Sequence, residues 1–338
     1  MENEKNDSIP EIISLEEVDE ILKNLDKDKK VDNKKEVNTE INNIADKNKK
    51  TDKSVTSPAS NKKKKKKLFK VLYYVAMFIL IGVFVGCSIY LISYYWQAKK
   101  IDKQVDELKD LFVEENDDID YEVVEEEIIV NDEVKKTEFV YINGVKVQKK
   151  FAKIYEENND FVGWLKIDGT KIDYPVMQTL SDEEYYLHRD FDKKYNGNGT
   201  LFVDTDSDIG KPSDNILIYG HNMNNGNMFH DILNYEKQDY YSAHKYIEFD
   251  TIYGDGRYEV IASFREEIHD VDYDGFKYYN FFDANADYEF TNYVIETQQR
   301  TPYTIMESAS YGDKLITLST CAYHSKDGRY VVVAKKIE

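Results

Sequence analysis

A long apolar run places the strongest constraint on how this chain can fold. In residues 68–96 the only charged side chain is that of Lys70, and the run exceeds the roughly 20 residues that a helix needs to cross a bilayer. Tyrosine and tryptophan lie near both ends of the run, where amphipathic rings prefer the membrane interface. The sequence therefore predicts one transmembrane helix over residues 68–96.

Basic residues on the two sides of this run predict its orientation. Six consecutive lysines, at 62–67, precede it, and fewer basic residues follow it. The more basic flank of a membrane helix stays in the cytoplasm. A cleaved signal peptide would be shorter and would end at a small-residue cleavage site, which we do not find. We expect a single-pass protein of the cell membrane, with its N-terminus in the cytoplasm and its C-terminal part outside.

The composition of residues 1–67 predicts a disordered cytoplasmic tail. These residues are rich in Lys, Asp, Glu and Asn and poor in aromatic side chains, so they cannot bury enough apolar surface to offset chain entropy. One island, at 14–25, combines a capping-box pattern with apolar residues at helical spacing. It indicates either a docking helix for a cytoplasmic partner or a transient helix without one, because short isolated helices are marginal in water.

Charge narrows the classes of function open to the exported part. The chain has a formal net charge of −20 at pH 7, and its excess of acidic residues lies after residue 70. Such a surface repels nucleic acid and anionic lipid. We therefore expect no nucleic-acid function, and neutral or cationic partners fit better.

The exported residues divide into a stalk and a folded domain. Residues 97–147 begin with apolar residues at helical spacing and continue with an acidic stretch, which indicates a helical and acidic extracellular stalk. Residues 148–338 contain eight short runs rich in β-branched and aromatic residues. These runs predict a mostly β domain, either a closed barrel or a sandwich. The eight runs are 161–167, 172–178, 199–204, 215–220, 246–252, 257–264, 314–321 and 329–337.

Helical patterns interrupt the predicted strands in two places. Residues 284–300 carry aromatic and apolar side chains at helical spacing and predict a full helix between two late strands. A shorter helical pattern follows residue 226. The expected architecture is a mostly β domain decorated by helices.

The two cysteines of the chain lie in different environments. Cys87 falls within the predicted membrane helix, so Cys321 is the only thiol of the exported part and has no disulfide partner there. A lone exported cysteine is an inert buried side chain, an intermolecular bridge or a reactive nucleophile. The last interpretation requires a positioned base or cation, because a free thiol is mostly protonated at neutral pH.

Six histidines could supply the base. His221 directly follows a predicted apolar strand, so its imidazole should lie at the end of that strand. His324 comes three residues after Cys321 but occupies a presumed turn. The other four are expected to be ordinary surface or packing residues, namely His188, His230, His244 and His269.

Arg329 is the candidate cation. It opens a strand that should return antiparallel to the strand of Cys321, which brings its guanidinium beside the thiol. A multi-donor cation there can bind the oxyanion that forms when a thiolate attacks an amide carbonyl. Three flanking residues either line a substrate groove or pack within the strands, namely Tyr219, Ser319 and Thr320.

Two metal-binding patterns in the sequence are incomplete. Asp204, Asp206 and Asp208 alternate like the start of a calcium loop, but Ile209 stands where glycine is required and Asn215 where the final glutamate is required. Cys321 and His324 are spaced like one half of a zinc site, and the second half is missing. We expect no metal.

Several motifs together resemble the sortase family. They are "TLSTC" at 317–321, "GRYVVVAK" at 328–335, "YGHNM" at 219–223 and "GWLKIDGTKIDYPV" at 163–176. The serine in "TLSTC", the N-terminal helices and the long helix before the cysteine strand are most similar to class B. The resemblance implies an eight-stranded closed sortase-type β-barrel as the catalytic domain over 148–338, without a metal or organic cofactor.

The resemblance also implies a reaction. Cys321 would be the nucleophile, His221 the general acid and base, and Arg329 the oxyanion donor that also orients the substrate. The substrate would be an exported protein with a C-terminal sorting signal like Asn/Ser-Pro-x-Thr-Gly/Asn, cleaved after threonine. The resulting thioester would be resolved by an amine of a lipid-linked peptidoglycan precursor.

Two other functions stay open at this point. A cysteine protease on the same barrel would hydrolyse the same kind of signal and would differ only in whether water or an amine resolves the thioester. A non-catalytic surface-binding domain would keep Cys321 as a structural side chain. Ligation to an added amine distinguishes the first alternative, and the rate of thiol labelling distinguishes the second.

Overall fold

The computed structural model describes residues 60–114, 119–130 and 133–338. The helical pattern at 14–25 and most of the predicted cytoplasmic tail lie outside these described residues. The first described element is the helix α2 (Ser60–Lys109).

The helix α2 contains the predicted membrane span. Within the described part of the chain, it is the one helix long and apolar enough to cross a membrane, over Phe69–Lys109, and its most apolar window has a mean hydropathy of 2.6 with no residue buried. Large apolar side chains point outward along it; Phe84, for example, is 72% exposed. Such a surface is unfavourable in water and suits lipid.

The start of α2 corrects one expectation. Residues 60–67, predicted as the end of a disordered tail, are helical. Extending an existing helix costs far less than nucleating one, and lysine has a good helix propensity. The lysine run therefore continues the helix that the apolar residues form.

Eight strands form a closed barrel, which confirms the mostly β prediction and decides between barrel and sandwich. The strand order is β10-β11-β9-β8-β4-β5-β6-β7, and the two ends of this order also pair. The pairs β10–β7 and β5–β6 are parallel and the others are antiparallel. Closure leaves no unpaired sheet edge. The strands are β4 (Phe161–Lys166), β5 (Asp173–Met177), β6 (Leu201–Val203), β7 (Asn215–Tyr219), β8 (Tyr246–Thr251), β9 (Arg257–Glu267), β10 (Leu315–Cys321) and β11 (Gly328–Lys336).

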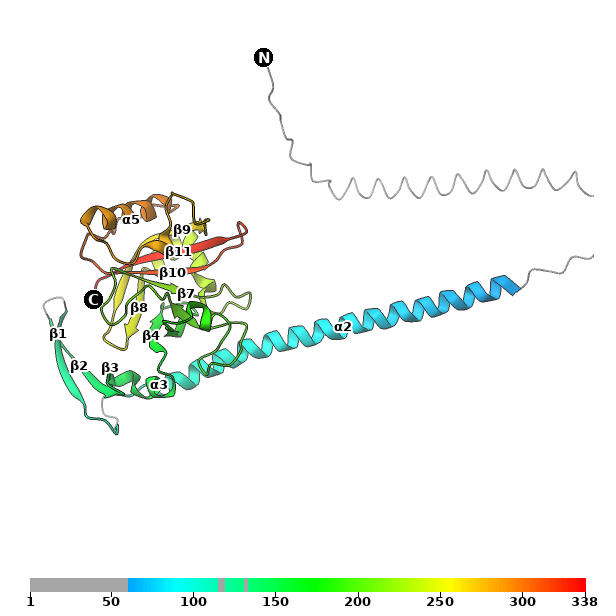
Figure 1. Ribbon diagram of the computed structural model, residues 1–338, viewed down its shortest axis with the longest axis horizontal. Coiled ribbons are helices and arrows are strands. Elements are labelled where there is room, and N and C mark those ends of the chain that lie inside the picture. Colours follow the sequence, from blue (N-terminus) through cyan, green and yellow to red (C-terminus); the bar gives the residue numbers. More distant parts are fainter. Residues whose placement is uncertain (1–59, 115–118, 131–132) are drawn as a thin grey trace, which may run out of the picture. The chain divides into compact units, whose positions relative to one another are not determined.

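Alternation along β11 divides the core into two clusters. Val332 packs inside the barrel, whereas Val331 and Val333 point outward and pack under the helix α5 (Asp287–Arg300). Successive side chains of a strand face opposite sides, so one apolar strand serves both clusters. Figure 1 shows α5 beside β9 and β11, and the helix predicted at 284–300 is confirmed.

Short helices connect the remaining strands. The α-helices are α3 (Ala152–Glu157) and α4 (Gln238–Ala243). The 3-10 helices are η1 (Lys149–Phe151), η2 (Glu183–Tyr186), η3 (Phe229–Glu236) and η4 (Tyr278–Asn280). The segment η3 corresponds to the shorter helical pattern expected after residue 226.

The segment 97–147 differs from the expected helical and acidic stalk. It is helical only to Lys109. Its second part forms an antiparallel sheet of β1 (Val124–Val130), β2 (Glu133–Ile142) and β3 (Val145–Gln148). Lysines of β2 face the acidic strand: Lys136 pairs with Glu125 at 3.2 Å, and opposite charges on neighbouring strands are favourable. The role of 97–147 as a spacer stays a prediction.

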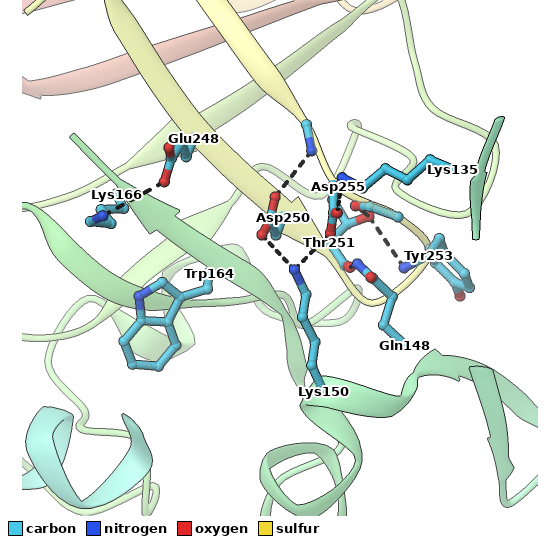
Figure 2. Close-up of polar contacts among 12 residues, drawn as sticks. Lys135, Gln148, Lys150, Trp164, Lys166, Glu248, Asp250, Thr251, Tyr253 and Asp255 are labelled. Carbon is cyan, nitrogen blue, oxygen red and sulfur yellow. Dashed lines mark hydrogen bonds and ion pairs between the residues drawn. The ribbon is translucent and has the colours of Figure 1, made fainter. Parts of the chain in front are cut away.

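Contacts with the barrel hold both parts of this segment. Ile101, Val105 and Leu108 of α2 are buried in the same cluster as the barrel interior. The sheet β1–β3 is attached through ion pairs: Lys135 of β2 lies 2.7 Å from Asp255. Lys150 of η1, which follows β3, lies 2.5 Å from Asp250 and 2.7 Å from Asp255 (Figure 2). The residues before the barrel are therefore packed against it.

Candidate active site

The hairpin of β10 and β11 brings Cys321 and Arg329 together. The two residues are directly paired across the antiparallel strands, as the sequence predicts. The intervening turn is closed by a hydrogen bond from the Ala322 N–H to the Gly328 carbonyl at 2.9 Å, and a Cβ at position 328 would overlap the Ala322 carbonyl. Both residues are partly exposed.

Parallel pairing of β7 with β10 brings His221 to the same end of the barrel. Tyr219 is paired with Ser319, so His221 and Cys321 each lie two residues beyond a paired position. The Gly220 N–H extends this pairing with a hydrogen bond to the Ser319 carbonyl at 3.2 Å. Carboxyl ends of parallel strands meet at one edge, so the backbone of His221 lies at the end of the barrel that also carries Cys321 and Arg329.

Glycine is required just before the histidine. A Cβ at position 220 would overlap the side chains of Leu201 and Phe229. The Gly220 carbonyl also accepts a hydrogen bond from the Thr320 hydroxyl at 2.7 Å. The backbone that carries His221 is thus held closely against β10.

The imidazole of His221 is held in a defined state. Its Nε2 lies 2.7 Å from the carbonyl oxygen of Leu187, and its ring stacks on that of His188 at 5.3 Å between centroids. Burial lowers the pKa of His221 below its usual value; the Leu187 carbonyl opposes this shift and His188 adds to it. At neutral pH the ring is therefore predominantly uncharged and can accept a proton.

Asn222 is a site residue that the sequence did not reveal. Its Nδ2 donates to the carbonyl of Cys321 at 3.1 Å, and its Oδ1 lies 2.9 Å from Nδ1 of His230. His230, expected to be an ordinary residue, thus supports the strand end that carries the thiol. The position of Asn222 directly after His221 was the only signal in the sequence.

The three flanking residues have different environments. Ser319 and Thr320 are 1% and 2% exposed. Ser319 shares a hydrogen bond with Tyr278 at 2.7 Å. Tyr219 is partly exposed, and its hydroxyl donates to Asp204 at 2.9 Å. This burial favours the packing interpretation for Ser319 and Thr320, and a groove role for any of the three stays a prediction.

The aspartates at 204–208 serve turns. Asp204 accepts hydrogen bonds from the Tyr219 hydroxyl and from the N–H of Asp206. Asp208 accepts from the N–H groups of Gly210 and Lys211, both at 2.8 Å. Among the described residues, no group of three or more His, Cys, Asp or Glu side chains is arranged to hold a metal ion.

The residue types at this end of the barrel match the requirements of acyl transfer. A thiol, an imidazole that accepts and returns a proton, and a guanidinium that stabilises an oxyanion are the parts needed to form and resolve a thioester. Cys321 and Arg329 lie on paired strands, and His221 lies two residues beyond β7 at the same end of the barrel.

Sequence comparison agrees with this chemistry. The family model described as the sortase domain matches residues 165–337, just over half of the chain. The sortase B of Staphylococcus aureus is 31% identical over 194 residues, which cover 57% of this chain and 76% of that protein.

Structure comparison gives the same family. The Staphylococcus aureus sortase B–substrate complex matches with a TM-score of 0.52 at 31% identity, covering 57% of this chain and 86% of that one. A crystal structure of sortase B from B. anthracis matches with a TM-score of 0.56 and covers 73% of this chain and 99% of that one. At 23% identity, this second match supports the fold alone.

Proposed function

Because this chain belongs to the sortase family and is a sortase B-like cysteine transpeptidase, we propose that Cys321 is its nucleophile. The substrate is an exported protein with a C-terminal sorting signal like Asn/Ser-Pro-x-Thr-Gly/Asn, cut after the threonine. The accepting group is an amine of a lipid-linked peptidoglycan precursor. The pairing of Cys321 with Arg329, at the barrel end that also carries His221, is the observation that supports this assignment.

The first step forms a thioester. The proton of Cys321 passes to His221, and the sulfur bonds to the carbonyl carbon of the threonine. Arg329 donates hydrogen bonds to the oxyanion. When the oxyanion collapses, the C–N bond breaks, and His221 gives its proton to the departing amine nitrogen.

The second step transfers the acyl group. The acceptor amine attacks the thioester carbon and loses a proton to His221, while Arg329 again holds the oxyanion. The C–S bond then breaks, and the sulfur recovers a proton. An amine product forms in place of an acid when the site favours the amine over water.

The proposal includes the topology of the chain. The long apolar helix before the sortase domain suggests membrane anchoring. We place the lysine-rich flank and the N-terminus in the cytoplasm and the catalytic domain, 148–338, outside. Residues 97–147 connect the span to the catalytic domain.

Replacing each cysteine in turn tests the nucleophile. The full chain in detergent micelles is assayed with fluorogenic peptides that cover the Asn/Ser-Pro-x-Thr-Gly/Asn pattern. Cys321→Ala should lower peptide cleavage by about 10³-fold or more, because the covalent route is lost. Cys87→Ala removes the thiol of the membrane helix and serves as the matched control, with cleavage close to that of the unmodified chain.

Two results would contradict the assignment. One is unchanged cleavage by Cys321→Ala. The other is an intact mass of the unmodified chain that shows no acyl adduct during turnover. Ligation of the released peptide to an added diamino acid or glycine tests the acceptor chemistry in the same assay.

A further inference from the structure

A segment that the proposed mechanism does not use covers the imidazole of His221. It follows η2 and runs over residues 187–198. The Leu187 carbonyl lies 2.7 Å from Nε2 of His221, and the His188 ring stacks on the His221 ring with an interplanar angle of 21°. Both contacts reach His221 from one short stretch of chain, more than 30 residues away in sequence.

We propose that His188 is a positioning residue for His221, and that the C-terminal end of α2 holds it in place through Asp190. The inference rests on the proposed function, in which His221 moves the protons. It assigns to the helix that leads from the membrane a mechanical role in the active site.

The Leu187 carbonyl determines which ring nitrogen of His221 carries the hydrogen and which can accept a proton. A carbonyl oxygen can only accept, so Nε2 of the neutral ring carries the hydrogen. Nδ1 is then the nitrogen that takes the proton of the thiol and returns it. A rotation of the ring that broke this hydrogen bond would leave the tautomer unspecified.

Stacking of His188 fixes the plane of the ring. The carbonyl of Leu187 constrains one atom of the imidazole, and the parallel face of His188 constrains rotation about the remaining axis. His188 itself lies beside Tyr195, at 6.4 Å between centroids. The two constraints together leave His221 little rotational freedom, and orientation of a reacting group accounts for a large part of catalysis.

The helix α2 holds the segment that carries these two contacts. Lys100 pairs with Asp190 at 2.5 Å, and the side chain of Asp190 is fully buried. Gln97 accepts a hydrogen bond from the N–H of Gly197 at 2.8 Å. A buried carboxylate without its cation is strongly unfavourable, so loss of Lys100 should loosen the segment.

A second contact from the same helix supports this role. Gln104 accepts from the N–H of Phe191 at 3.3 Å. Lys100 and Gln104 are four residues apart and therefore lie on one face of α2. That face contacts the residues immediately after His188.

The titration of His221 reports on these contacts. The titratable groups around it are His188 from the covering segment, Cys321 of β10 and Arg329 of β11 at the same barrel end, and His230 behind Asn222. Of these, His188 contributes to lowering the pKa of His221, together with burial. Removal of the His188 ring admits water and removes a potential positive charge, and both changes raise that pKa.

The first experiment replaces His188 in the full chain. His188→Ala should lower kcat/KM about 10-fold, and one limb of its pH profile should move upward by about half a unit or more. His188→Phe restores a stacking face without a charge, so it should recover most of the rate while retaining part of the shift. The matched control is His244→Ala, which removes a histidine stacked on Tyr240 at 4.1 Å elsewhere in the domain.

A purely structural role for His188 would give a different result. Rate would then fall in proportion to lost thermal stability, Phe would not rescue it, and the pH profile would keep its midpoints. That result, or wild-type kinetics for both variants, overturns the proposal for His188.

The second experiment breaks the contact with α2. Lys100→Met should lower kcat/KM about 3- to 10-fold with little change in KM, because the loss is one of orientation. Lys103→Met is the matched control, since Lys103 pairs with the exposed Glu107 on the same helix. Equal kinetics for the two variants contradict the role of α2.

The two proposals fail in distinguishable ways. If Cys321→Ala cleaves normally, the proposed function is wrong. If Cys321→Ala is inactive while the His188 and Lys100 variants behave like their controls, the proposed function stands and the positioning role is wrong.

Discussion

The two ends of strand β11 use charge in opposite ways. At its first residues, Arg329 lies beside Cys321, and within the described part of the chain no carboxylate forms an ion pair with that guanidinium. Toward its last residues, Lys336 lines a polar cavity of about 490 Å³ together with Asp250 and Asp255. Among the described residues, the guanidinium at the first end forms no ion pair, whereas several ion pairs lie around the second end.

Figure 2 shows how thoroughly charges are paired at the second end. Lys150 lies between Asp250 and Asp255, and Lys135 reaches Asp255 from β2. Although burial opposes its ionisation, the neighbouring Lys150 and Lys135 hold the pKa of Asp255 at about 2. These ion pairs attach the strands before the barrel to the barrel itself.

This difference in ion pairing predicts that one end of β11 contributes mainly to reactivity and the other mainly to stability. A guanidinium that forms no ion pair and a partly buried imidazole contribute little to stability, and active sites commonly carry this cost. Ion pairs on neighbouring elements near the other end of β11 offset that cost. Substitutions at the first end should therefore change rate more than stability, and substitutions at the second end should do the reverse.

Arg329 should give the largest effect on rate. Arg329→Lys should lower kcat/KM for a sorting-signal peptide about 100-fold, because a point charge cannot reproduce the planar set of donors around the oxyanion. The unfolding temperature should change little, since Arg329 forms no ion pair among the described residues. Peptide cleavage and thermal unfolding of the full chain are measured together.

The same substitution at the other end is its control. Arg257 pairs with Glu338 at 3.4 Å and lies over the ring of Tyr246. Arg257→Lys should leave kcat/KM within about 2-fold. A near-normal rate for Arg329→Lys, or an equal loss for Arg257→Lys, would remove the contrast between the two ends.

Lys150 should give the largest effect on stability. Lys150→Met leaves two partly buried carboxylates without their shared cation, and should lower the free energy of unfolding by about 1–2 kcal/mol. Peptide cleavage below the unfolding transition should be unchanged. Chemical denaturation of the full chain in detergent measures the first quantity.

Lys166 is the matched control for Lys150. Its partners, Asp168 and Glu248, are more exposed, and the distance to Glu248 is 3.8 Å. Lys166→Met should change the free energy of unfolding by less than about 0.5 kcal/mol. If Lys150→Met and Lys166→Met lower the free energy of unfolding equally, burial of the ion pairs around Asp255 adds nothing to stability.

The fold was predictable where local pattern decides it. All eight barrel strands and the helix α5 were evident in the sequence, because β-branched runs bounded by turn residues need no distant information. Closure into a barrel depends on the pairing of β7 with β10, across about 100 residues, and propensity carries no signal for that. The strands β1–β3 were missed because their acidic composition suggests solvation unless the lysines of β2 are placed opposite.

At the candidate site, the sequence indicated residue types and their places on the strands, and the catalytic roles stay predictions. Strand ends identified Cys321, His221 and Arg329 as candidates, since each lies at the boundary of an apolar run. The contacts that hold His221 were not predictable: His188 was expected to be an ordinary residue because its stacking partner is 33 positions away. Orientation of a catalytic group is a tertiary property, whereas its chemical type is visible in the sequence.

The two ends of β11 should also differ in how stability depends on pH, an effect smaller than those predicted for Arg329→Lys and Lys150→Met. At the paired end, the pKa of Asp255 is lowered from its usual 3.8 to about 2. The unfolded chain therefore binds a proton first, and the stability that Asp255 contributes is present above about pH 4 and is lost as pH falls toward 2. At the site end, the pKa of His221 is also lowered, from its usual 6.5, so its contribution is lost as pH falls below about 6.5.

Two variants should each reduce the loss of stability in one of these two pH ranges, below about pH 6.5 or between pH 4 and 2. The unfolding temperature of Lys150→Met should fall less steeply than that of the unmodified chain between pH 4 and 2, because one of the two lysines that lower the pKa of Asp255 is gone and only Lys135 remains. His221→Gln should flatten the curve just below pH 6.5 and leave the acidic window unchanged. If either variant alters the other window, the two ends of β11 are coupled, and the division between a stabilising end and a reactive end is wrong.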